Sequence, residues 1–371
     1  MERKIKIMTV FGTRPEAIKM APVINEIKKR EEFECVVCVT GQHREMLDSV
    51  LRCFDIFADV DLDIMKQGQS LSHITSRILD GIEPVLLSLR PELVLVHGDT
   101  STAFASALAC FYLRIPIGHV ESGLRTYDMR SPFPEEWNRQ AISRLSDIHF
   151  APTRAAYQNL LREGVGERSI AITGNTAIDA IRSTVRKDWT HPLLDWARGG
   201  RLCLMTAHRR ESLGGAMANI FRSVRRIADE FEDVRIVYPV HPNPTLGALA
   251  ERELGGHERI RLIPPMDTLD FHNLMARAYM VITDSGGVQE EAPSLGIPTL
   301  VMRDITERPE GIFSYSARLI GTSEGSVYRG IRDLLEEPAR HAAMSGARDI
   351  YGDGCASERI VDFITDFFDL R

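Results

Sequence analysis

Short apolar runs alternate with longer amphipathic stretches along almost the whole chain, and this alternation constrains the fold more than any other feature. Runs rich in β-branched residues occur at 5–11, 33–40, 93–98, 115–120, 147–152 and 169–173, with helical patterns between them. Parallel strands require a crossover connection, usually a helix, so this alternation is typical of βα units. We therefore predict an α/β fold with a parallel sheet and helices on both of its faces.

A second series of apolar runs begins near residue 200, at 201–207, 234–240, 259–263, 279–285 and 297–302. The stretch 186–200 between the two series has no clear strand pattern and is the candidate connection. A chain of 371 residues is also longer than one ordinary core usually holds. We therefore predict two doubly wound halves, followed by one amphipathic helix at the C-terminus.

Charge and cysteine usage exclude several classes of function. The formal net charge of −7 argues against non-specific nucleic-acid binding and against an anionic membrane surface, which both need a basic field. No apolar run reaches the roughly 18 residues of a membrane helix, and the N-terminal run is too short for a signal peptide. Cys35 and Cys38 stand three apart in a strand-like run, so they point to opposite faces and make a poor redox or zinc pair. We expect a reduced, cytoplasmic protein without a metal.

Three carboxylates follow the apolar runs of the first series. Asp99 comes after the run 93–98, Glu121 after 115–120, and Glu135 opens a later helical pattern. Ligands of doubly wound folds bind at the carboxyl ends of the strands. Asp99 taken alone is better explained as a helix N-cap, and Glu135 suits a first helical turn. Glu121 has no helix behind it to cap. If the three converge, they could supply an acid and a base to one substrate.

The segment after the first apolar run combines a helix start with two cations. Thr13 and Glu16 have the spacing of a capping box. Arg14 and Lys19 lie near the same helix N-terminus, where the helix dipole disfavours positive charge. A nearby anion would compensate them, so an anion site competes here with a purely structural helix start.

The second series carries a candidate phosphate site. Ser285, Gly286 and Gly287 stand between the run 279–285 and a helical pattern. Small residues at a strand-to-helix turn let backbone N–H groups approach a phosphate, although a plain tight turn would use the same residues.

Charged residues surround this candidate phosphate site in the sequence. Glu291 lies within the next turn, where a carboxylate can reach a ribose diol, whereas we expect a solvated position for Glu290. His208 follows the first run of this series, and a charged loop that includes Arg308 follows the run 297–302.

Several familiar catalytic motifs are missing from the sequence. It has no Walker A loop, no GxGxxG after the first strand, no GxSxG elbow and no HExxH, and its eleven histidines lack metal-ligand spacing. A phosphate site in the second half and carboxylates in the first suggest a nucleoside-diphosphate sugar, with the nucleotide on the second half and the sugar on the first.

The strings FGTRPEAIKMAP, GQHREML, HGDTSTA, HVESGLRT, PFPEEWNR, TGNTAIDA, AHRRES, VYPVH, TDSGGVQEEAPSLG, MRDITERPEG and YGDG occur in this order. Together they resemble the bacterial non-hydrolysing UDP-N-acetylglucosamine 2-epimerases. The resemblance implies the glycosyltransferase-B architecture, in which two Rossmann-like domains face a central cleft. Residues 1–175, completed by the helix 356–371, would form the first domain, and residues 176–355 the UDP-binding second.

The resemblance also implies an activity. Family members interconvert UDP-N-acetylglucosamine (UDP-GlcNAc) and UDP-N-acetylmannosamine (UDP-ManNAc) for cell-surface polysaccharide synthesis. They do so without NAD, another cofactor or an essential metal, and typically as cytoplasmic homodimers. The expected route is elimination of UDP to 2-acetamidoglucal, followed by re-addition.

Individual residues match the family's site positions. The carboxylates Asp99, Glu121 and Glu135 match the proposed acids and bases, and His208 matches a histidine near the diphosphate. The matching substrate contacts are Arg14, Lys19, Met266 (through its backbone, to the base), Phe271 (beside uracil), Ser285, Gly286, Gly287, Glu291 and Arg308.

Regulated members of the family bind a second UDP-GlcNAc as an activator. Gln42, Arg209 and His241, together with Glu135, match positions of that site. Glu45 and Gly68 stand where regulated relatives have Gln and Arg, so the sequence leaves allosteric activation open.

Three other functions remain alternatives at this stage. A hydrolysing 2-epimerase would release free ManNAc and UDP, and a retaining glycosyltransferase of the same architecture would need an acceptor. A UDP-sugar sensor would bind without turnover, although the intact carboxylates argue against it.

Overall fold

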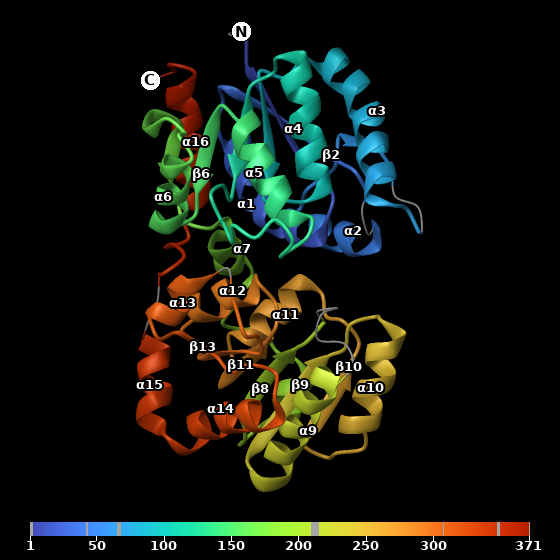
Figure 1. The fold of residues 1–371 in the computed structure, drawn as a ribbon, viewed down its shortest axis with the longest axis vertical. Coiled ribbons are helices and arrows are strands. Elements are labelled where there is room, and N and C mark those ends of the chain that lie inside the picture. Colours follow the sequence, from blue (N-terminus) through green and yellow to red (C-terminus); the bar gives the residue numbers. More distant parts are fainter. Residues whose placement is uncertain are drawn as a thin grey trace. The chain divides into compact units, whose positions relative to one another are not determined.

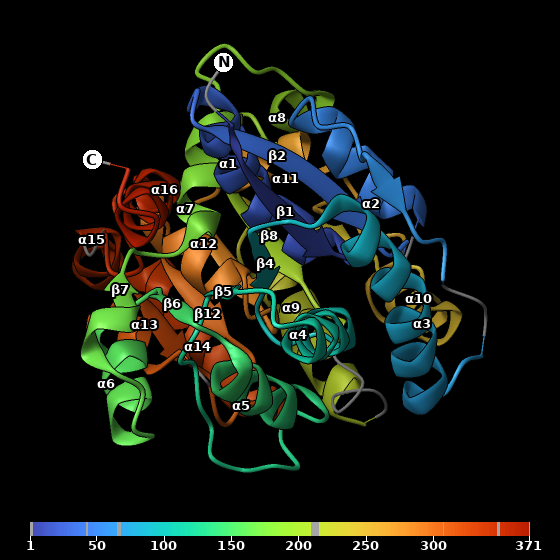
Figure 2. The same cartoon turned by 90° about the horizontal axis from the view of Figure 1, so that it is seen from above.

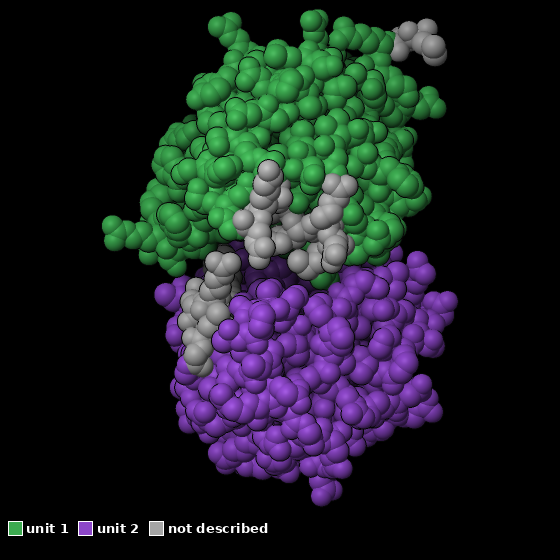
Figure 3. All heavy atoms as spheres, turned by 90° about the vertical axis from the view of Figure 1, so that its right-hand side faces the viewer, with its two compact units in different colours: residues 1–182, 351–371 green, residues 183–350 purple. Residues whose placement is uncertain are grey.

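The computed structural model describes residues 3–41, 44–64, 68–208, 215–306, 308–346 and 349–370, of which residues 44–46 by their backbone alone. The chain divides into two compact units, which Figure 3 shows in separate colours. Unit 1 comprises residues 1–182 and 351–371, and unit 2 comprises residues 183–350. The sequence predicts divisions after residues 175 and 355.

The strands of unit 1, drawn in blue to green in Figure 1, form a seven-stranded parallel sheet. Their order is β3-β2-β1-β4-β5-β6-β7. The chain therefore winds in one direction from β1 to β3 and in the other from β4 onward. The strands are β1 (Ile5–Phe11), β2 (Phe33–Val39), β3 (Val60–Asp61), β4 (Leu93–His97), β5 (Ile117–Val120), β6 (Ile148–Ala151) and β7 (Ile170–Ile172).

Helices cover both faces of this sheet, as expected for a doubly wound fold. Along β1, Ile7 belongs to a core with α1, α2 and α16, whereas Met8 belongs to a core with α3, α4 and α5. Figure 2 shows α4 and α5 on one side of the sheet and α1 and α16 on the other. The helices are α1 (Arg14–Lys29), α2 (Arg44–Cys53), α3 (Leu71–Leu89), α4 (Ser101–Leu113), α5 (Glu135–Leu145), α6 (Arg154–Arg162), the 3-10 turn η1 (Glu167–Ser169), α7 (Thr176–Thr184) and α16 (Ala356–Phe367).

Unit 2 contains a six-stranded parallel sheet with the order β10-β9-β8-β11-β12-β13. Its strands are β8 (Arg201–Thr206), β9 (Val234–Pro239), β10 (Ile260–Ile263), β11 (Met280–Thr283), β12 (Thr299–Val301) and β13 (Ala317–Leu319). Its helices are α8 (Pro192–Trp196), α9 (Gly215–Glu230), α10 (Pro244–Leu254), α11 (Thr268–Met275), α12 (Val288–Ser294), α13 (Pro309–Phe313), α14 (Glu324–Glu336) and α15 (Pro338–Gly346).

The predicted α/β fold with two doubly wound parallel sheets is confirmed, and every predicted apolar run contains a strand. Two strands escaped prediction. β3 has two residues and β13 has three, and both lie at sheet edges, so neither leaves a recognisable periodic pattern. No helix within the described ranges is long and apolar enough to span a bilayer.

The strand orders fix where a ligand can bind. In unit 1 the winding direction reverses between β1 and β4, and in unit 2 it reverses between β8 and β11. In doubly wound folds a reversal generally leaves a crevice at the carboxyl ends of the two strands, because the helices that follow them turn to opposite faces. The segments after β1, β4, β8 and β11 are those that the sequence singled out.

Candidate active site

Glu121 directly follows β5 and is held in a strained position with little exposure to solvent. Its backbone has φ 62°, a left-handed conformation that non-glycine residues rarely adopt. Its Oε1 accepts hydrogen bonds from Nζ of Lys19 and, at 2.8 Å, from Nδ2 of Asn175. The side chains of Lys19 and Glu121 are both less than one-tenth exposed. Such a buried ion pair needs additional hydrogen bonds to offset desolvation, and Asn175 supplies one.

His97 ends β4 and faces the other oxygen of the same carboxylate. Its Nε2 lies 3.9 Å from Oε2 of Glu121, and the residue is 3% exposed. Neither ring nitrogen has a hydrogen-bond partner among the described residues, which is rare for a buried polar group. Burial lowers the pKa of His97 to about 4; Glu121 opposes this shift and Lys19 adds to it. His97 is therefore a neutral imidazole beside Glu121.

Asp99 is not the N-cap of α4, contrary to the structural role that the sequence favoured for it. Thr100 caps the helix instead, since its Oγ1 accepts a hydrogen bond from the N–H of Ala103 at 3.0 Å. The side chain of Asp99 pairs with Arg139 of α5, and its backbone carbonyl accepts a hydrogen bond from Asn138 at 2.9 Å. The sequence favours a cap one residue too early because Asp and Thr are both good N-caps.

Glu16 completes the expected capping box and also ties two helix starts together. Its carboxylate accepts from the N–H groups of Gly12 and Thr13, and its N–H donates to Thr13 Oγ1. The hydroxyl of Thr100 donates to Oε1 of Glu16 at 2.7 Å. Burial raises the pKa of Glu16, and these hydrogen bonds oppose the shift. The starts of α1 and α4 are thus joined where β1 and β4 end.

Glu135 and Glu136 open α5 but serve different purposes. Glu136 is fully buried and accepts hydrogen bonds from the N–H groups of Thr126 and Tyr127, both at 3.0 Å, so it shapes the preceding loop. Glu135 is only partly buried. It begins the helix whose next turn contacts Asp99, which places all three predicted carboxylates on neighbouring segments of unit 1.

His208 follows β8 and is anchored by a buried aspartate at the end of β11. The backbone N–H of His208 donates to Oδ2 of Asp284 at 2.8 Å, and its Nδ1 lies 3.1 Å from Oδ1. Asp284 is 1% exposed, whereas the His208 side chain is 41% exposed. The ring stacks at 5.9 Å on that of His241, the residue matched to the activator site. Of the other matched positions, Gln42 and Arg209 lie outside the described residues, as does the side chain of Glu45, whereas Glu135 is described.

Ser285, Gly286 and Gly287 form the turn between β11 and α12. The N–H of Ser285 donates to Thr283 Oγ1 at 2.9 Å, while those of Gly286 and Gly287 have no hydrogen-bond partner among the described residues. A Cβ on Gly286 would lie 2.8 Å from the guanidinium of Arg308. The glycine thus leaves room for a cation beside a turn with these backbone N–H groups, a combination that suits an anion.

Glu290 holds that cation in place, so the expectation of a solvated Glu290 is wrong. Arg308 Nε donates to Glu290 Oε1 at 2.6 Å, and the two residues are 9% and 1% exposed. The sequence could not show this pairing, because the partner lies on a loop after the next strand. Glu291, predicted to contact ribose, is also buried, and its carboxylate lies 3.9 Å from His272 Nε2.

The remaining predicted substrate contacts are Arg14 in unit 1 and Met266 and Phe271 in unit 2. Arg14 is partly buried at the first position of α1. Met266 lies partly buried between β10 and α11, and Phe271 lies on α11, its ring 6.4 Å from that of His272.

The cysteine pair of β2 is not set up for redox or metal chemistry. Burial raises the pKa of Cys35 and of Cys38 to about 12. Among the described residues no group of three or more His, Cys, Asp or Glu could hold a metal ion.

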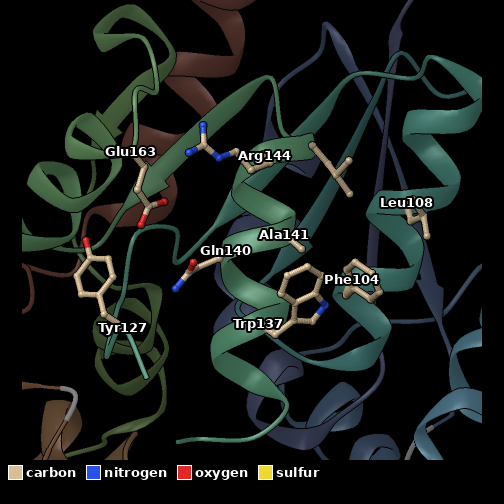
Figure 4. A pocket seen from close by; sticks show the side chains of 9 residues that line it. Phe104, Leu108, Tyr127, Trp137, Gln140, Ala141, Arg144 and Glu163 are labelled. Carbon is tan, nitrogen blue, oxygen red and sulfur yellow. The ribbon is translucent and has the colours of Figure 1, made fainter. Parts of the chain in front are cut away.

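A separate apolar pocket of about 480 Å³ lies at the surface between α4 and α5 (Figure 4). Phe104 and Leu108 of α4 and Trp137 and Ala141 of α5 line it, with Tyr127 from the preceding loop. None of the predicted site residues contributes to its lining.

Comparisons with known proteins identify the family of this chain. The family model for UDP-N-acetylglucosamine 2-epimerase matches residues 25–365. The UDP-N-acetylglucosamine 2-epimerase of Bacillus subtilis is 53% identical over 360 residues, which cover 97% of this chain and 95% of that protein. The enzyme of the same name from Escherichia coli K12 is 48% identical over 369 residues, covering 96% and 98%.

Solved structures agree as well. The Neisseria meningitidis UDP-GlcNAc 2-epimerase bound to UDP-GlcNAc has a TM-score of 0.93 at 44% identity, covering 98% of this chain and all of that one. The Staphylococcus aureus MnaA–UDP complex has a TM-score of 0.95 at 48% identity, covering 99% and 98%. The glycosyltransferase SnogD of Streptomyces nogalater, at 16% identity and a TM-score of 0.63, shares the fold alone. The chain belongs to the UDP-N-acetylglucosamine 2-epimerase family.

Proposed function

We propose that the protein interconverts UDP-GlcNAc and UDP-ManNAc by inverting C2 of the sugar, with no release of free sugar. The observation that carries this proposal is Glu121, a carboxylate that is less than one-tenth exposed, with one oxygen anchored by Lys19 and Asn175 and the other facing His97. Family membership supports the substrate class, and the Neisseria relative was solved with UDP-GlcNAc bound.

The position of C2 dictates the order of steps. The C2–H bond is not next to a carbonyl, so its direct deprotonation is too costly. If the C1–O bond to UDP breaks first, the developing oxocarbenium ion acidifies C2–H, and a carboxylate takes that proton. The products of this elimination are 2-acetamidoglucal and UDP. Protonation of C2 on the opposite face and return of the UDP oxygen to C1 then give the epimer, so atoms and charge balance.

Unit 1 would carry out the proton transfers. Asp99, Glu121 and Glu135 are the candidate acids and bases, because each follows a strand end or opens a helix beside one. Their environments differ: Glu121 pairs with Lys19 in a buried setting, Asp99 pairs with Arg139, and Glu135 is partly exposed. Carboxylates in unlike surroundings can take opposite roles at one pH.

Unit 2 would bind UDP and stabilise it as the leaving group. The backbone N–H groups of Gly286 and Gly287 and the guanidinium of Arg308 would form an anion cradle, and His208, held by Asp284, follows the neighbouring strand. Fixed donors of this kind stabilise charge that develops as a bond breaks. Following the resemblance, Glu291 would bind the ribose, and Phe271 and Met266 would contact uracil.

Product analysis tests this proposal. Purified protein incubated with UDP-GlcNAc should yield UDP-ManNAc and no free sugar on anion-exchange chromatography, and Glu121→Gln should abolish turnover while UDP still binds. Free ManNAc with UDP would identify a hydrolysing enzyme. UDP binding without any turnover would identify a sensor.

We also propose that the protein works as a cytoplasmic homodimer. Phe111 and Tyr112 at the end of α4 and Trp137 on α5 are each more than half exposed, and the α4–α5 pocket lies on the same helices (Figure 4). An exposed aromatic surface of this kind suits a second copy of the chain. Light scattering should give twice the chain mass of 41.7 kDa. The double variant Phe111→Arg/Tyr112→Arg should give the mass of one chain, because two charges would replace the aromatic contacts. A wild-type protein of single mass would refute the dimer.

The saturation curve for UDP-GlcNAc tests the activator site. Because Glu45 and Gly68 replace the Gln and Arg of regulated relatives, a hyperbolic curve would indicate that the second site is lost. A sigmoidal curve would indicate that it is retained.

A further inference from the structure

Two of the quoted motifs, TGNT at residues 173–176 and YGDG at residues 351–354, have no role in the proposed chemistry, yet they meet in unit 1. The N–H of Asn175 donates to the carbonyl of Tyr351 at 2.7 Å. Gly174 and Gly352 have φ of 90° and 127°, and a Cβ on either would lie 3.1–3.2 Å from the Cα of the other. The two backbones can pack this closely only with glycine at both positions.

Further hydrogen bonds and an ion pair hold the TGNT and YGDG segments together. Asp179 of α7 accepts hydrogen bonds from the N–H groups of Ala356 and Ser357, the first two residues of α16. Arg359 donates to the carbonyl of Thr173 at 3.0 Å and pairs with Asp353. Tyr351 is also the first residue of unit 1 after the chain returns from unit 2. Asn175 is therefore held by two segments that are far apart in the sequence.

The direction of the Asn175 side chain is fixed by its own neighbours. Asn175 is 2% exposed, and its Oδ1 accepts the N–H of Ala177 at 2.9 Å. Only the amide oxygen can accept this bond, so the nitrogen must occupy the opposite end. That nitrogen donates to Oε1 of Glu121 at 2.8 Å.

We propose that Asn175 is a positioning residue for Glu121, held in place by the junction of the TGNT and YGDG segments. Lys19 and Asn175 both bind Oε1, so the carboxylate is turned with Oε2 toward His97. Lys19 supplies a flexible point charge that alone would not fix this rotation, whereas the rigid amide does. The inference rests on the proposed function, because it assigns a purpose to the orientation of a catalytic carboxylate.

Two charged or titratable groups of the described residues face Glu121 at known distance, namely Lys19 from α1 and His97 from β4. A substitution at residue 175 alters neither of them. A donor to a carboxylate favours its charged form, so removal of the amide should make Glu121 protonate at higher pH. It should also let the carboxylate rotate.

The test compares Asn175→Ala and Asn175→Asp with the control Asn25→Ala, whose amide belongs to unit 1 but donates only to the carbonyl of Phe54. We expect kcat to fall roughly 10- to 100-fold in Asn175→Ala, with KM within about threefold and the acid limb of the pH–rate profile at higher pH. Asn175→Asp keeps the bond to Ala177 but sets a second carboxylate against Glu121, so its loss should be larger. The control should behave as wild type.

The proposal is overturned if either Asn175 variant folds and has the wild-type kcat and a pH–rate profile whose acid limb lies at the wild-type pH. A second measurement tests the positioning role of Asn175 independently of the proposed epimerase activity. Carbon-13 NMR of carboxyl-labelled glutamate, with the Glu121 signal identified by its loss in Glu121→Gln, follows the titration of this group without substrate. A wild-type protein that does not epimerise refutes the proposed function. An unchanged Glu121 titration in Asn175→Asp refutes the positioning role.

Discussion

Removal of Glu290 should destabilise unit 2 and weaken UDP binding at the same time. Glu290 is the buried partner of Arg308, with 2.6 Å between Nε and Oε1. Glu290→Ala would leave a guanidinium that is only 9% exposed without this carboxylate. Breaking one partner of a buried ion pair costs about 3–5 kcal/mol, because the remaining charge stays desolvated.

This free energy converts into a measurable shift. In a domain of about 150–250 residues, each kcal/mol moves the melting temperature by about 2–4 °C, so we expect a drop of roughly 6–20 °C for unit 2. Because Arg308 also lies beside Gly286 in the proposed phosphate site, the affinity for UDP should fall roughly 10- to 100-fold, as expected when a charged hydrogen bond is lost.

Scanning calorimetry and titration calorimetry with UDP measure the two effects. Glu336→Ala is the matched control, because the Arg332–Glu336 pair of α14 has a similar separation of 2.8 Å but is nearly half exposed. An exposed pair contributes at most about 1 kcal/mol. Replacing both Glu290 and Arg308 by Met should restore most of the stability but not UDP affinity, since no buried charge remains. The reasoning is refuted if Glu290→Ala melts within 2 °C of the control.

Two further predictions follow from the geometry of the site. Gly286→Ala should weaken UDP binding at least tenfold, because the new Cβ would lie 2.8 Å from Arg308; Gly247→Ala, with no atom within 4 Å, should bind UDP as wild type does, and equal affinities would contradict the cradle. Acid should destabilise unit 1, because burial lowers the pKa of His97 and of His149 from 6.5 to about 4. The stability that these neutral imidazoles contribute is complete above pH 6.5 and is lost as the pH falls toward 4, so urea unfolding should show a loss of about 2 kcal/mol for each by pH 5; equal stability at pH 7 and 5 would contradict this.

Much of the fold was predictable because its signals are local. Runs such as 5–11 and 201–207 become strands since their residues bury both faces of a parallel sheet, and Thr13 caps α1 through a contact three residues away. The placement of polar clusters after the strands follows from the fold class itself.

The remaining features depend on partners that are distant in the sequence. Glu290 has the spacing of a solvated helix face, and only Arg308, on a loop beyond the next strand, makes its burial possible. Asp99 turns from the expected cap toward Arg139 of α5. Asn175 carried no chemical signal of its own, and its bond to Glu121 exists because the chain folds back across 54 residues. Such pairings arise from tertiary packing, which periodicity does not encode.

The fate of the C2 proton tests the central claim most directly. Purified protein is incubated with UDP-GlcNAc in D2O, and the sugar signals are followed by proton NMR. Elimination and re-addition predict that UDP-ManNAc appears with deuterium at C2, because the proton removed by an active-site carboxylate exchanges with solvent before the opposite face is protonated. UDP-ManNAc that retains its original C2 proton would contradict the mechanism assigned to these carboxylates.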